Sequence, residues 1–410
     1  MIRIINCSIY LFFIFISIAH SHYFSESYSK WVVDEEYIEG TFNVLELEST
    51  RVLQLPQLQK YLYEDDLTES EVFLKYLNDN IKVLSNQNVC QKTKPFTILA
   101  SEQGSLNITM NFQCKSGDAI KIINNAFFDI VQSHVHIARV YQNDQIITEK
   151  ALFYNDQTIN LSHYKDDELK NSFFKNFLSF VDTGIQHILN GFDHLLFIAG
   201  LILLTIGFRN LLLIITGFTI GHSITLALSF LGFVIPNMMI IESLIGFTIL
   251  FIGIEYHLIK TGNYKTINIF LILLLFSIYC LSFYIPLLIS YYGLLGLLLF
   301  SFGYFSLHKN LKDKNILLLL ITVLFGLIHG YGFGSFLIKS QISSENLLSA
   351  LFGFNIGVEI GQIIFVIIIL VIFKIIRYFK LDIILESLKN IIFIFIVSLG
   401  FFWFIERLII

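Results

Sequence analysis

The segment His187-Ile-Leu-Asn-Gly-Phe-Asp193-His194 opens the first long apolar stretch of the chain. An ionisable side chain inside a bilayer costs roughly 2.5 to 3.5 kcal/mol even on the lenient insertion scales. Two imidazoles and a carboxylate at one membrane boundary therefore need a compensating role. We expect the helices that follow to supply partners for them.

The composition indicates a membrane protein with a polar amino-terminal half. Of the 410 residues 55% are hydrophobic and only 4 are Pro, and the mean hydropathy is +0.69, mostly because of residues 185–410. The formal net charge is −5, and the acidic excess lies in the first 185 residues. The chain has no basic tract and no Lys/Arg cluster interleaved with aromatic residues, so we expect no nucleic-acid partner.

Residues 1–21 are expected to be a secretory signal peptide, with Arg3 as its charged start and Ala19-His20-Ser21 as its cleavage site. An uncleaved anchor helix is the alternative, and it leaves the orientation of the following residues unchanged. The polar half would then lie outside the cytoplasm. Its only two cysteines after this leader, Cys90 and Cys114, are expected to form a disulfide.

Residues 22–165 are predicted to form a mainly β extracytoplasmic domain of sandwich type. Residues 106–112 alternate apolar and polar side chains, as a half-buried strand does, whereas residues 65–85 are more helical. The predicted strands are 42–47, 95–100, 105–113, 119–123 and 135–141. His134 and His136 share one strand face, but two histidines on one strand are weak evidence for a metal, so a core or surface role is favoured.

An amphipathic segment, residues 166–184, leads into a transmembrane domain, residues 185–410. It holds eight apolar stretches of about the spanning length: 185–207, 211–235, 237–259, 266–285, 287–307, 315–338, 346–373 and 390–406. The predicted fold is therefore an α-helical polytopic membrane bundle of about eight spans, with an N-terminal mainly β domain. We expect it in the cell (inner) membrane.

The basic residues support an even number of spans in the region where two stretches run together, 266–307. With eight spans the inner loops hold nearly all of them, and the outer connections have little beyond Lys339, as the positive-inside rule requires. The inner-loop residues are Arg209, Lys260, Lys265, Lys309, Lys312, Lys314, Lys374, Arg377, Lys380 and Lys389.

The predicted spans contain no Lys or Arg, yet they hold four carboxylates and five histidines: Asp193, Glu242, Glu255, Glu359, His187, His194, His222, His257 and His329. Imidazoles beside carboxylates suit a divalent metal. Counted at 1.5 Å per residue from the outer end of each span, His194 and His329 lie at about 14 Å, and His222 and Glu359 at about 20 Å. Glu255 and His257 fall near the inner surface and are expected to be interfacial.

We therefore predict a metal site made of residues from four helices: His187, Asp193, His194, His222, His329 and Glu359. Supporting polar residues follow at helical spacing: Asn190, Thr225, Asn355, Gln362 and, less deep, Glu242. For any single histidine among them a satisfied hydrogen bond in the bundle core is the alternative. The glycines around His329 predict either close backbone approach or a broken helix, and Gly353, Gly357 and Gly361 predict close helix packing.

Four blocks of this sequence, in order, resemble the HupE/UreJ family of membrane proteins. They are His187-Ile-Leu-Asn-Gly-Phe-Asp-His194, Gly221-His-Ser-Ile-Thr225, Phe325-Gly-Leu-Ile-His-Gly-Tyr-Gly-Phe-Gly334 and Phe354-Asn-Ile-Gly-Val-Glu-Ile-Gly-Gln362. The resemblance covers roughly residues 180–375. It implies nickel or cobalt uptake beside hydrogenase or urease systems, and a metalloenzyme-maturation or extracytoplasmic protein as a partner. Short members have a second histidine where this chain has Phe333, and they lack the large outer domain, so the chain resembles the long branch.

Two functions remain open, and they leave it uncertain whether the chain is an enzyme. The first is a permease that gathers Ni²⁺, Co²⁺ or Zn²⁺ near Asp182 and His187, since nitrogen-rich sites favour late first-row metals. The second is an intramembrane hydrolase of a lipid or membrane-anchored peptide, in which Glu359 or Asp193 activates a zinc-bound water. A metal-handling accessory protein is a third option. The apolar inner halves of the spans favour a one-sided pocket, whereas the family resemblance favours transport.

Overall fold

The computed structural model describes residues 25–408 except 35, 64–66, 87, 103–104, 115–118, 132–133, 153, 155, 163–168, 235–236, 263, 311–313 and 341–346. The predicted signal peptide, residues 1–21, lies outside this part of the chain. The described residues form two compact units. The β unit comprises residues 22–183 with 339–350, and the helical unit comprises residues 184–338 with 351–410.

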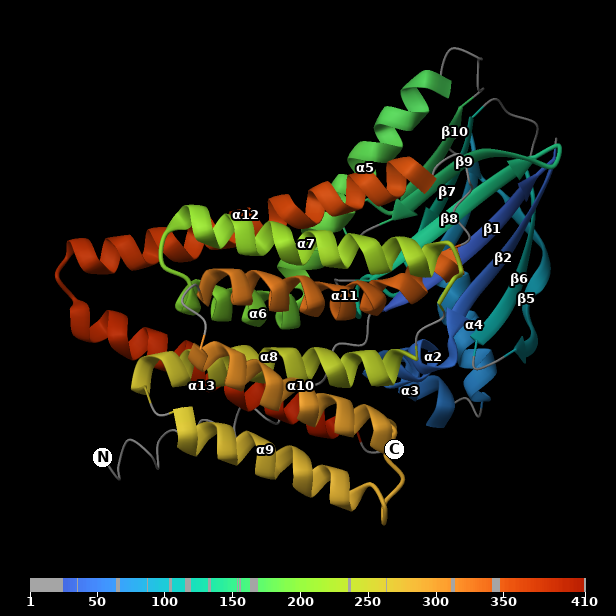
Figure 1. The fold of residues 1–410 in the computed structure, drawn as a ribbon. Helices are drawn as coiled ribbons and strands as arrows, with labels where there is room; N and C mark the ends of the chain where they lie inside the picture. Colours follow the sequence, from blue (N-terminus) through green and yellow to red (C-terminus); the bar gives the residue numbers. More distant parts are fainter. Residues whose placement is uncertain are drawn as a thin grey trace. The chain divides into compact units, whose positions relative to one another are not determined.

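The β unit contains two sheets (Figure 1). The six-stranded sheet has the order β5-β6-β2-β1-β8-β9 and the four-stranded sheet the order β10-β7-β3-β4. Among the described strands, β1 and β8 pair in parallel, from Glu26 opposite Val135 to Val32 opposite Tyr141, and the other pairs are antiparallel. The strands are β1 (Glu26–Val33), β2 (Tyr37–Leu45), β3 (Ile81–Ser85), β4 (Asn88–Val89), β5 (Gln91–Glu102), β6 (Ser105–Gln113), β7 (Ala119–Asn124), β8 (Val135–Gln142), β9 (Gln145–Leu152) and β10 (Thr158–Ser162).

The two sheets share one hydrophobic core, which contains Phe42 of β2, Phe112 of β6 and Ile122 of β7. Three helices also belong to this unit: α2 (Glu46–Leu53), α3 (Pro56–Tyr63) and α4 (Glu69–Asn80). The sequence predicted only the last of them. Thr68 and Glu71 form a capping box that starts α4, because each side chain binds the other residue's backbone N–H.

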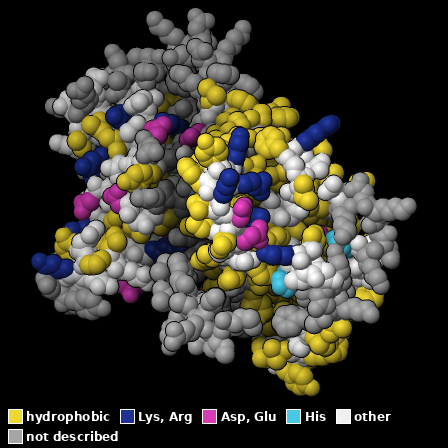
Figure 2. Space-filling model, turned by 90° about the vertical axis from the view of Figure 1, so that its left-hand side faces the viewer, with side chains coloured by type: hydrophobic (Ala, Val, Ile, Leu, Met, Phe, Trp, Pro, Cys, Tyr) yellow, Lys and Arg dark blue, Asp and Glu magenta, His cyan; other side chains and the backbone are white. Residues whose placement is uncertain are grey.

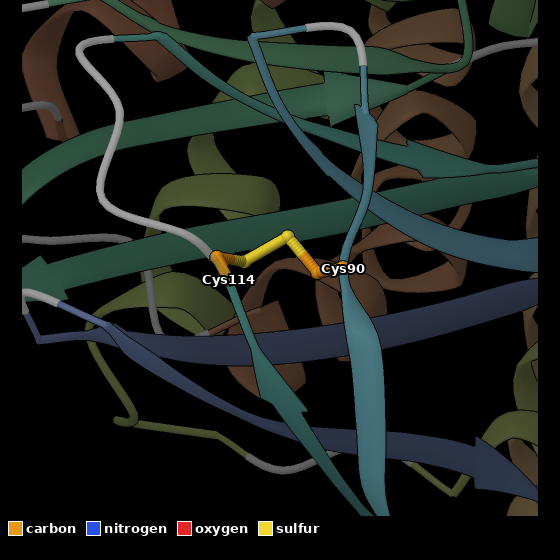
Figure 3. Close-up of a disulfide and its surroundings, with 2 residues drawn as sticks. All are labelled: Cys90 and Cys114. Atoms are coloured by element: carbon orange, nitrogen blue, oxygen red, sulfur yellow. A yellow bond between two sulfur atoms is a disulfide. The ribbon is translucent and has the colours of Figure 1, made fainter.

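Cys90 and Cys114 form a disulfide in the β unit (Figure 3). Cys90 directly precedes β5 and Cys114 directly follows β6, and these two strands are antiparallel neighbours. The bond therefore joins the same end of two paired strands. Both cysteines are buried in the shared core.

The long helices are α5 (Leu169–Asn190), α6 (Phe192–Leu204), α7 (Phe208–Phe230), α8 (Met238–Thr261), α9 (Tyr264–Leu281), α10 (Tyr291–Asn310), α11 (Lys314–Ser340), α12 (Leu347–Tyr378) and α13 (Asp382–Glu406). Among the described residues, five are long and apolar enough to cross a membrane: α7, α8, α11, α12 and α13. The bent pair α5 and α6 makes a sixth. The apolar described part of α9 is shorter, and α10 is not among the five, so the count of eight spans stays a prediction.

Basic side chains gather where α8 ends and α13 begins. Lys260 donates to Glu386 (3.4 Å) and to Asn390 (2.8 Å), and Lys389 binds the same Glu386 (2.7 Å). A short turn joins α12 to α13, so Arg377 and Lys380 belong to this end too. Figure 2 shows Lys and Arg side chains beside acidic ones within a largely hydrophobic surface. We call the end that carries Lys260, Arg377, Lys380 and Lys389 the basic end.

Candidate metal centre

A break between α5 and α6 brings together the polar residues of the segment 187–194. α5 ends at Asn190, α6 begins at Phe192, and the two axes differ by 73°. The ring centroids of His187 and His194 are consequently 4.6 Å apart. The predicted span 185–207 is therefore not one continuous helix. Asn190, expected on the same face as the two histidines, is exposed and donates to Gln186 (3.3 Å).

Gly191 makes this break possible. A Cβ at this position would lie 2.8 Å from the carbonyl oxygen of His187 and 2.9 Å from Nδ1 of His194. Both distances are shorter than a carbon atom tolerates without a shift of its neighbours. The absence of a side chain at residue 191 thus lets the last turn of α5 and the first turn of α6 approach each other.

Glycines also hold α7 against α11 and so place His222 and His329. A Cβ at Gly330 would lie 2.2 Å from the carbonyl oxygen of His222, and one at Gly221 would lie 2.2 Å from that of Val323. The two helices are in backbone contact along this seam, as small residues permit. α11 runs through His329 without interruption. Of the two predicted alternatives, the structure has close backbone approach.

Two overlapping groups of metal-ligating side chains result in the helical unit. Nitrogen atoms of His187, His194 and His222 lie within 4.8 Å of one another. Ligand atoms of Asp193, His194 and His329 do so as well. His194 belongs to both groups, so four imidazoles and one carboxylate from α5, α6, α7 and α11 surround one small volume. We call these five residues the histidine centre.

Hydrogen bonds fix the tautomers of two of these histidines. Asp193 Oδ1 accepts from the backbone N–H of His194 (2.9 Å) and from its Nδ1 (2.9 Å). Thr248 donates its hydroxyl hydrogen to the carbonyl of Ile245 (2.8 Å), so its oxygen accepts from Nε2 of His329 (2.9 Å). The lone pairs on Nε2 of His194 and Nδ1 of His329 remain, and neither atom has a hydrogen-bond partner among the described residues. A metal-binding imidazole needs this arrangement, with one nitrogen donating outward and the other open.

Aromatic rings enclose the histidine centre. The ring of His329 lies 5.1 Å from that of Phe218 and 5.2 Å from that of Phe197, and the ring of His222 stacks on Phe354 at 6.1 Å. The imidazoles are buried, whereas the Asp193 side chain is 29% exposed. Asp193 is therefore the least buried residue of the histidine centre. Asp182, proposed to gather cations, is exposed.

Glu359 belongs to neither group in the described structure. Its Oε1 accepts from the hydroxyl of Thr216 (2.6 Å) on α7. Thr219, one turn further along α7, donates to Oε1 of Gln362 (3.0 Å). These two pairs form a polar stripe between α7 and α12. Among the other predicted supporting residues, Asn355 donates to the carbonyl of Leu351 and interacts with His222, and Thr225 is buried against the backbone of α7.

Two intramembrane carboxylates have partners that the sequence did not indicate. Glu242 forms an ion pair with Arg407 (3.4 Å), which lies one residue beyond the last predicted span. Glu255, expected to be interfacial, is buried inside the helical unit and is 2% exposed; its depth in the membrane stays a prediction. It interacts with Tyr304 and with His308. His308 was not predicted as a partner because it directly follows the predicted span 287–307.

In the β unit, His134 and His136 have no nitrogen left for a metal. Each ring nitrogen of both residues is hydrogen-bonded to a serine hydroxyl. Both side chains are buried. The core role, which the sequence favoured over metal binding, is the one that the structure has.

A family model described as HupE / UreJ protein matches residues 164–283 and 293–407. A search of curated proteins finds no match to the chain. The matched segments contain all five residues of the histidine centre, and they extend beyond the range of roughly 180–375 inferred from the four sequence blocks, up to the end of α13.

Proposed function

Because the chain belongs to the HupE / UreJ family, we propose that it is a membrane permease for a divalent late first-row metal, with Ni²⁺ and Co²⁺ as the preferred cargo. The family is linked to nickel and cobalt handling. The observation that carries the proposal is the histidine centre, in which ligand atoms of each group lie within 4.8 Å of one another. Four imidazoles and one carboxylate suit Ni²⁺, Co²⁺ or Zn²⁺, whereas Mg²⁺ and Ca²⁺ prefer all-oxygen sites.

The enclosure of the centre supports binding of a desolvated ion. A divalent cation among Phe197, Phe218 and Phe354 is stable only if protein ligands replace its hydration shell. The fixed lone pairs of His194 and His329 are ready to do so without rearrangement. Asp193 contributes negative charge at the exposed side and holds His194 in the required tautomer.

The polar stripe between α7 and α12 supports passage onward from this centre. Thr219 and Thr216 precede His222 by three and six residues, which corresponds to about 4.5 and 9 Å along α7. α7 begins directly after α6, and α6 runs alongside α8, with Gly200 against Ile252, toward the end of α8 that carries Lys260. The stripe thus leads from the histidines toward the basic end. Its ligands are oxygens, which bind late first-row metals more weakly than imidazole does.

We place the basic end in the cytoplasm, since basic residues of membrane proteins concentrate on that side. The exposed side of Asp193 then faces outward, and the β unit lies outside the cytoplasm. In this orientation the cation enters beside Asp193, binds the histidines and leaves past Gln362 and Glu359. The membrane concerned is the cell (inner) membrane.

Hydrolysis receives less support from the geometry. A metal-dependent hydrolase needs a carboxylate beside the metal that can take a proton from the bound water. Asp193 Oδ1 already accepts two hydrogen bonds from His194. The Glu359 carboxylate accepts a hydrogen bond from Thr216, which precedes His222 of the histidine centre by six residues on α7. An accessory protein that binds the metal without moving it uses the same centre, so only a flux measurement separates it from a permease.

The experiment compares wild type with His194→Ala in sealed liposomes that contain a metal-sensitive dye. We expect Ni²⁺ or Co²⁺ uptake by wild type, and an affinity at least about tenfold weaker in the variant, because even the loss of an outer partner costs that much. His257→Ala is the matched control, since His257 is an intramembrane histidine that stacks on Phe393 away from the centre. Tight metal binding without flux in wild type would indicate an accessory protein and contradict the permease. Absence of metal binding would contradict both functions.

A further inference from the structure

A second polar cluster is buried in the helical unit, apart from the histidine centre. The hydroxyl of Tyr304 donates to Oε1 of Glu255, and Nε2 of His308 lies 3.7 Å from the same oxygen. All three side chains are at most 5% exposed. Glu255 belongs to α8, and the other two belong to α10. A carboxylate and an imidazole at this depth are costly and need a stabilising arrangement or a function.

Aromatic side chains separate this cluster from the histidine centre. Thr248, which binds His329, and Glu255 are seven residues apart on one face of α8, about 10.5 Å along the helix. Phe251 lies between them, with its ring 5.0 Å from that of Tyr304 and 5.6 Å from that of Phe325. Phe325 in turn contacts Phe197, which borders the histidine centre. Glu255 is thus on the side of this layer toward Lys260 and the basic end.

The donor set of the cluster fits a proton better than a metal ion. Neither Glu255 nor His308 belongs to a group of three metal-ligating side chains in the described part of the chain. A divalent cation on one carboxylate and one imidazole would leave uncompensated charge in an apolar surrounding, which is costly. With one proton between them the pair is neutral, either as imidazolium and carboxylate or as imidazole and carboxylic acid. Such a pair takes up and releases its proton as a unit.

Two of the lysines at the basic end already bind a carboxylate. Lys260 of α8 and Lys389 of α13 both bind Glu386. His257 of α8 stacks on Phe393 of α13 at 5.3 Å. α11 carries no titratable side chain from Asn315 to Ile328, and Tyr279 of α9 contacts Phe283 near the start of α10, away from His308. Tyr304 and His308 both contact Oε1 of Glu255, so a proton can pass among these three side chains.

We infer that Glu255, His308 and Tyr304 form a proton-exchange site that drives or regulates passage of the cation through the histidine centre. A proton taken up from one side makes the pair positive and disfavours a cation nearby. Release of that proton restores neutrality and favours the cation. Proton and metal thereby move in opposite directions. The coupling rests on the proposed permease function, whereas proton exchange by the pair does not.

The first test is independent of transport. Infrared difference spectra of the purified protein, recorded across a pH series, should contain a protonated-carboxyl band that is absent in Glu255→Gln and shifted in His308→Gln. The glutamine still accepts from Tyr304, so the fold should persist. Glu386→Gln, which removes an exposed carboxylate at the basic end, should leave the band unchanged. The absence of a pH-dependent band that responds to substitution of residue 255 would overturn the proton site.

The second test measures the coupling in liposomes. An inside-acidic pH gradient should change the rate of Ni²⁺ uptake by wild type severalfold, and Glu255→Gln should remove that dependence while its Ni²⁺ affinity remains. A rate of Ni²⁺ uptake by wild type that is the same with and without the pH gradient would overturn the coupling. Failure of the proposed permease has a different signature, because wild type then shows no uptake with or without a gradient while the infrared band still responds to residue 255. Equal gradient dependence in wild type and Glu255→Gln would also overturn the coupling.

Discussion

Seven buried side chains of the β unit form a hydrogen-bonded chain with a single direction. In order of donation they are Trp31, Ser29, His136, Ser27, His134, Ser25 and Glu48. The indole of Trp31 can only donate, and the hydroxyl of Ser25 donates to Glu48. Each hydroxyl between these ends therefore donates once and accepts once, and both imidazoles carry their proton on Nδ1. We call this chain the serine–histidine ladder.

Removal of the middle hydroxyl should break the ladder at two places. In Ser27→Ala, Nε2 of His134 loses its donor and Nδ1 of His136 loses its acceptor. A buried group without a partner costs about 1 to 3 kcal/mol, so the loss of partners for two groups should lower the free energy of unfolding of the β unit by about 2 to 6 kcal/mol. Trp31 fluorescence in a Trp403→Phe background reports the unfolding by denaturant.

Thr97→Ala is the matched control for this prediction. Thr97 also shares a hydroxyl–hydroxyl hydrogen bond, with Thr109 (2.6 Å), but at an exposed position. Water replaces the lost partner there, and the free energy of unfolding should change by less than about 1 kcal/mol. Equal effects of the two substitutions would show that the ladder contributes no more than a surface contact.

The ladder also predicts a pH dependence of stability. Burial lowers the pKa of His134 well below its usual range and the pKa of His136 to about 3. In the unfolded chain both titrate near pH 6.5, so the unfolded state binds more protons below that pH. Stability is therefore complete above about pH 7 and declines as the pH falls, by about 2 kcal/mol for each histidine between pH 7 and pH 5.

The measurement is the denaturant midpoint of Trp31 fluorescence at pH 7 and at pH 5, and His136→Gln should show about half of the wild-type decrease. Burial raises the pKa of Glu48, so this group stabilises the folded state as the pH falls from its raised pKa toward that of an unfolded glutamate. Its contribution has the opposite sign to that of the histidines, so the measured decrease is a lower bound for theirs. Equal pH dependence of wild type and His136→Gln would contradict the buried, neutral state of His136.

At this scale the sequence indicated residue types more reliably than partners. The absence of basic residues from the spans pointed to His194, His222 and His329, and the structure brings them together. Depth along a helix does not specify which way a side chain turns, however. Glu359 has the depth predicted for a ligand, yet it binds Thr216. The partners of Glu255 were not predicted, because an apolar neighbourhood in the sequence gives no sign of a tyrosine and a histidine on another helix.

Among the elements, the bent pair α5 and α6 decides the geometry of the histidine centre. An apolar stretch that contains Asn190-Gly191 is compatible with a continuous helix, so hydrophobic periodicity cannot reveal the bend. Gly184 and Gly361 pack in the α5–α12 interface, and this packing favours the bend. Of the two, only Gly361 belonged to the glycine face predicted for α12. Strand β1 was missed for a related reason, since its inward face carries Ser27 and Ser29 of the ladder in place of apolar residues.

Gly191→Ala should weaken metal binding without loss of the bundle. The added Cβ meets the carbonyl of His187 and Nδ1 of His194, so it forces apart the two turns that supply ligands. We expect the Ni²⁺ affinity of the purified protein, measured by calorimetry, to fall by about tenfold or more, as for other losses of ligand orientation. Gly296→Ala in α10 is the control, because a Cβ there meets no atom within 4 Å. An unchanged affinity in Gly191→Ala would mean that His187 is not a ligand.

For the whole molecule the open quantity is the number of membrane crossings. The composition and hydropathy were sufficient to predict a β-rich region followed by a helical membrane part. They were not sufficient for the count, because α9 and α10 are less apolar or shorter than the other helices. Whether this hairpin crosses the bilayer depends on lipid and neighbouring helices, which a hydropathy window does not contain.

Cysteine accessibility in intact cells should settle both the orientation and this count. In a Cys280→Ser background, a membrane-impermeant maleimide should label Tyr37→Cys of the β unit, since Tyr37 is exposed. Lys380→Cys, at the basic end, should react only after permeabilisation. This pair of outcomes requires an odd number of crossings between the two positions, and it holds whether α9 and α10 both cross or neither does. Labelling of Lys380→Cys in intact cells would contradict the proposed orientation.

The position of the turn between α9 and α10 shows whether these two helices cross the membrane. The turn lies outside if both cross and on the cytoplasmic side if neither does. Tyr284 is highly exposed in this turn, and no basic residue lies between the end of α9 and the start of α10, which fits an outer connection under the positive-inside rule. We therefore expect Tyr284→Cys to react with the impermeant maleimide in intact cells, as eight spans require. Protection until permeabilisation would indicate that the hairpin stays on the cytoplasmic side. His308 would then sit in a re-entrant element, and protons would reach Glu255 from that side alone.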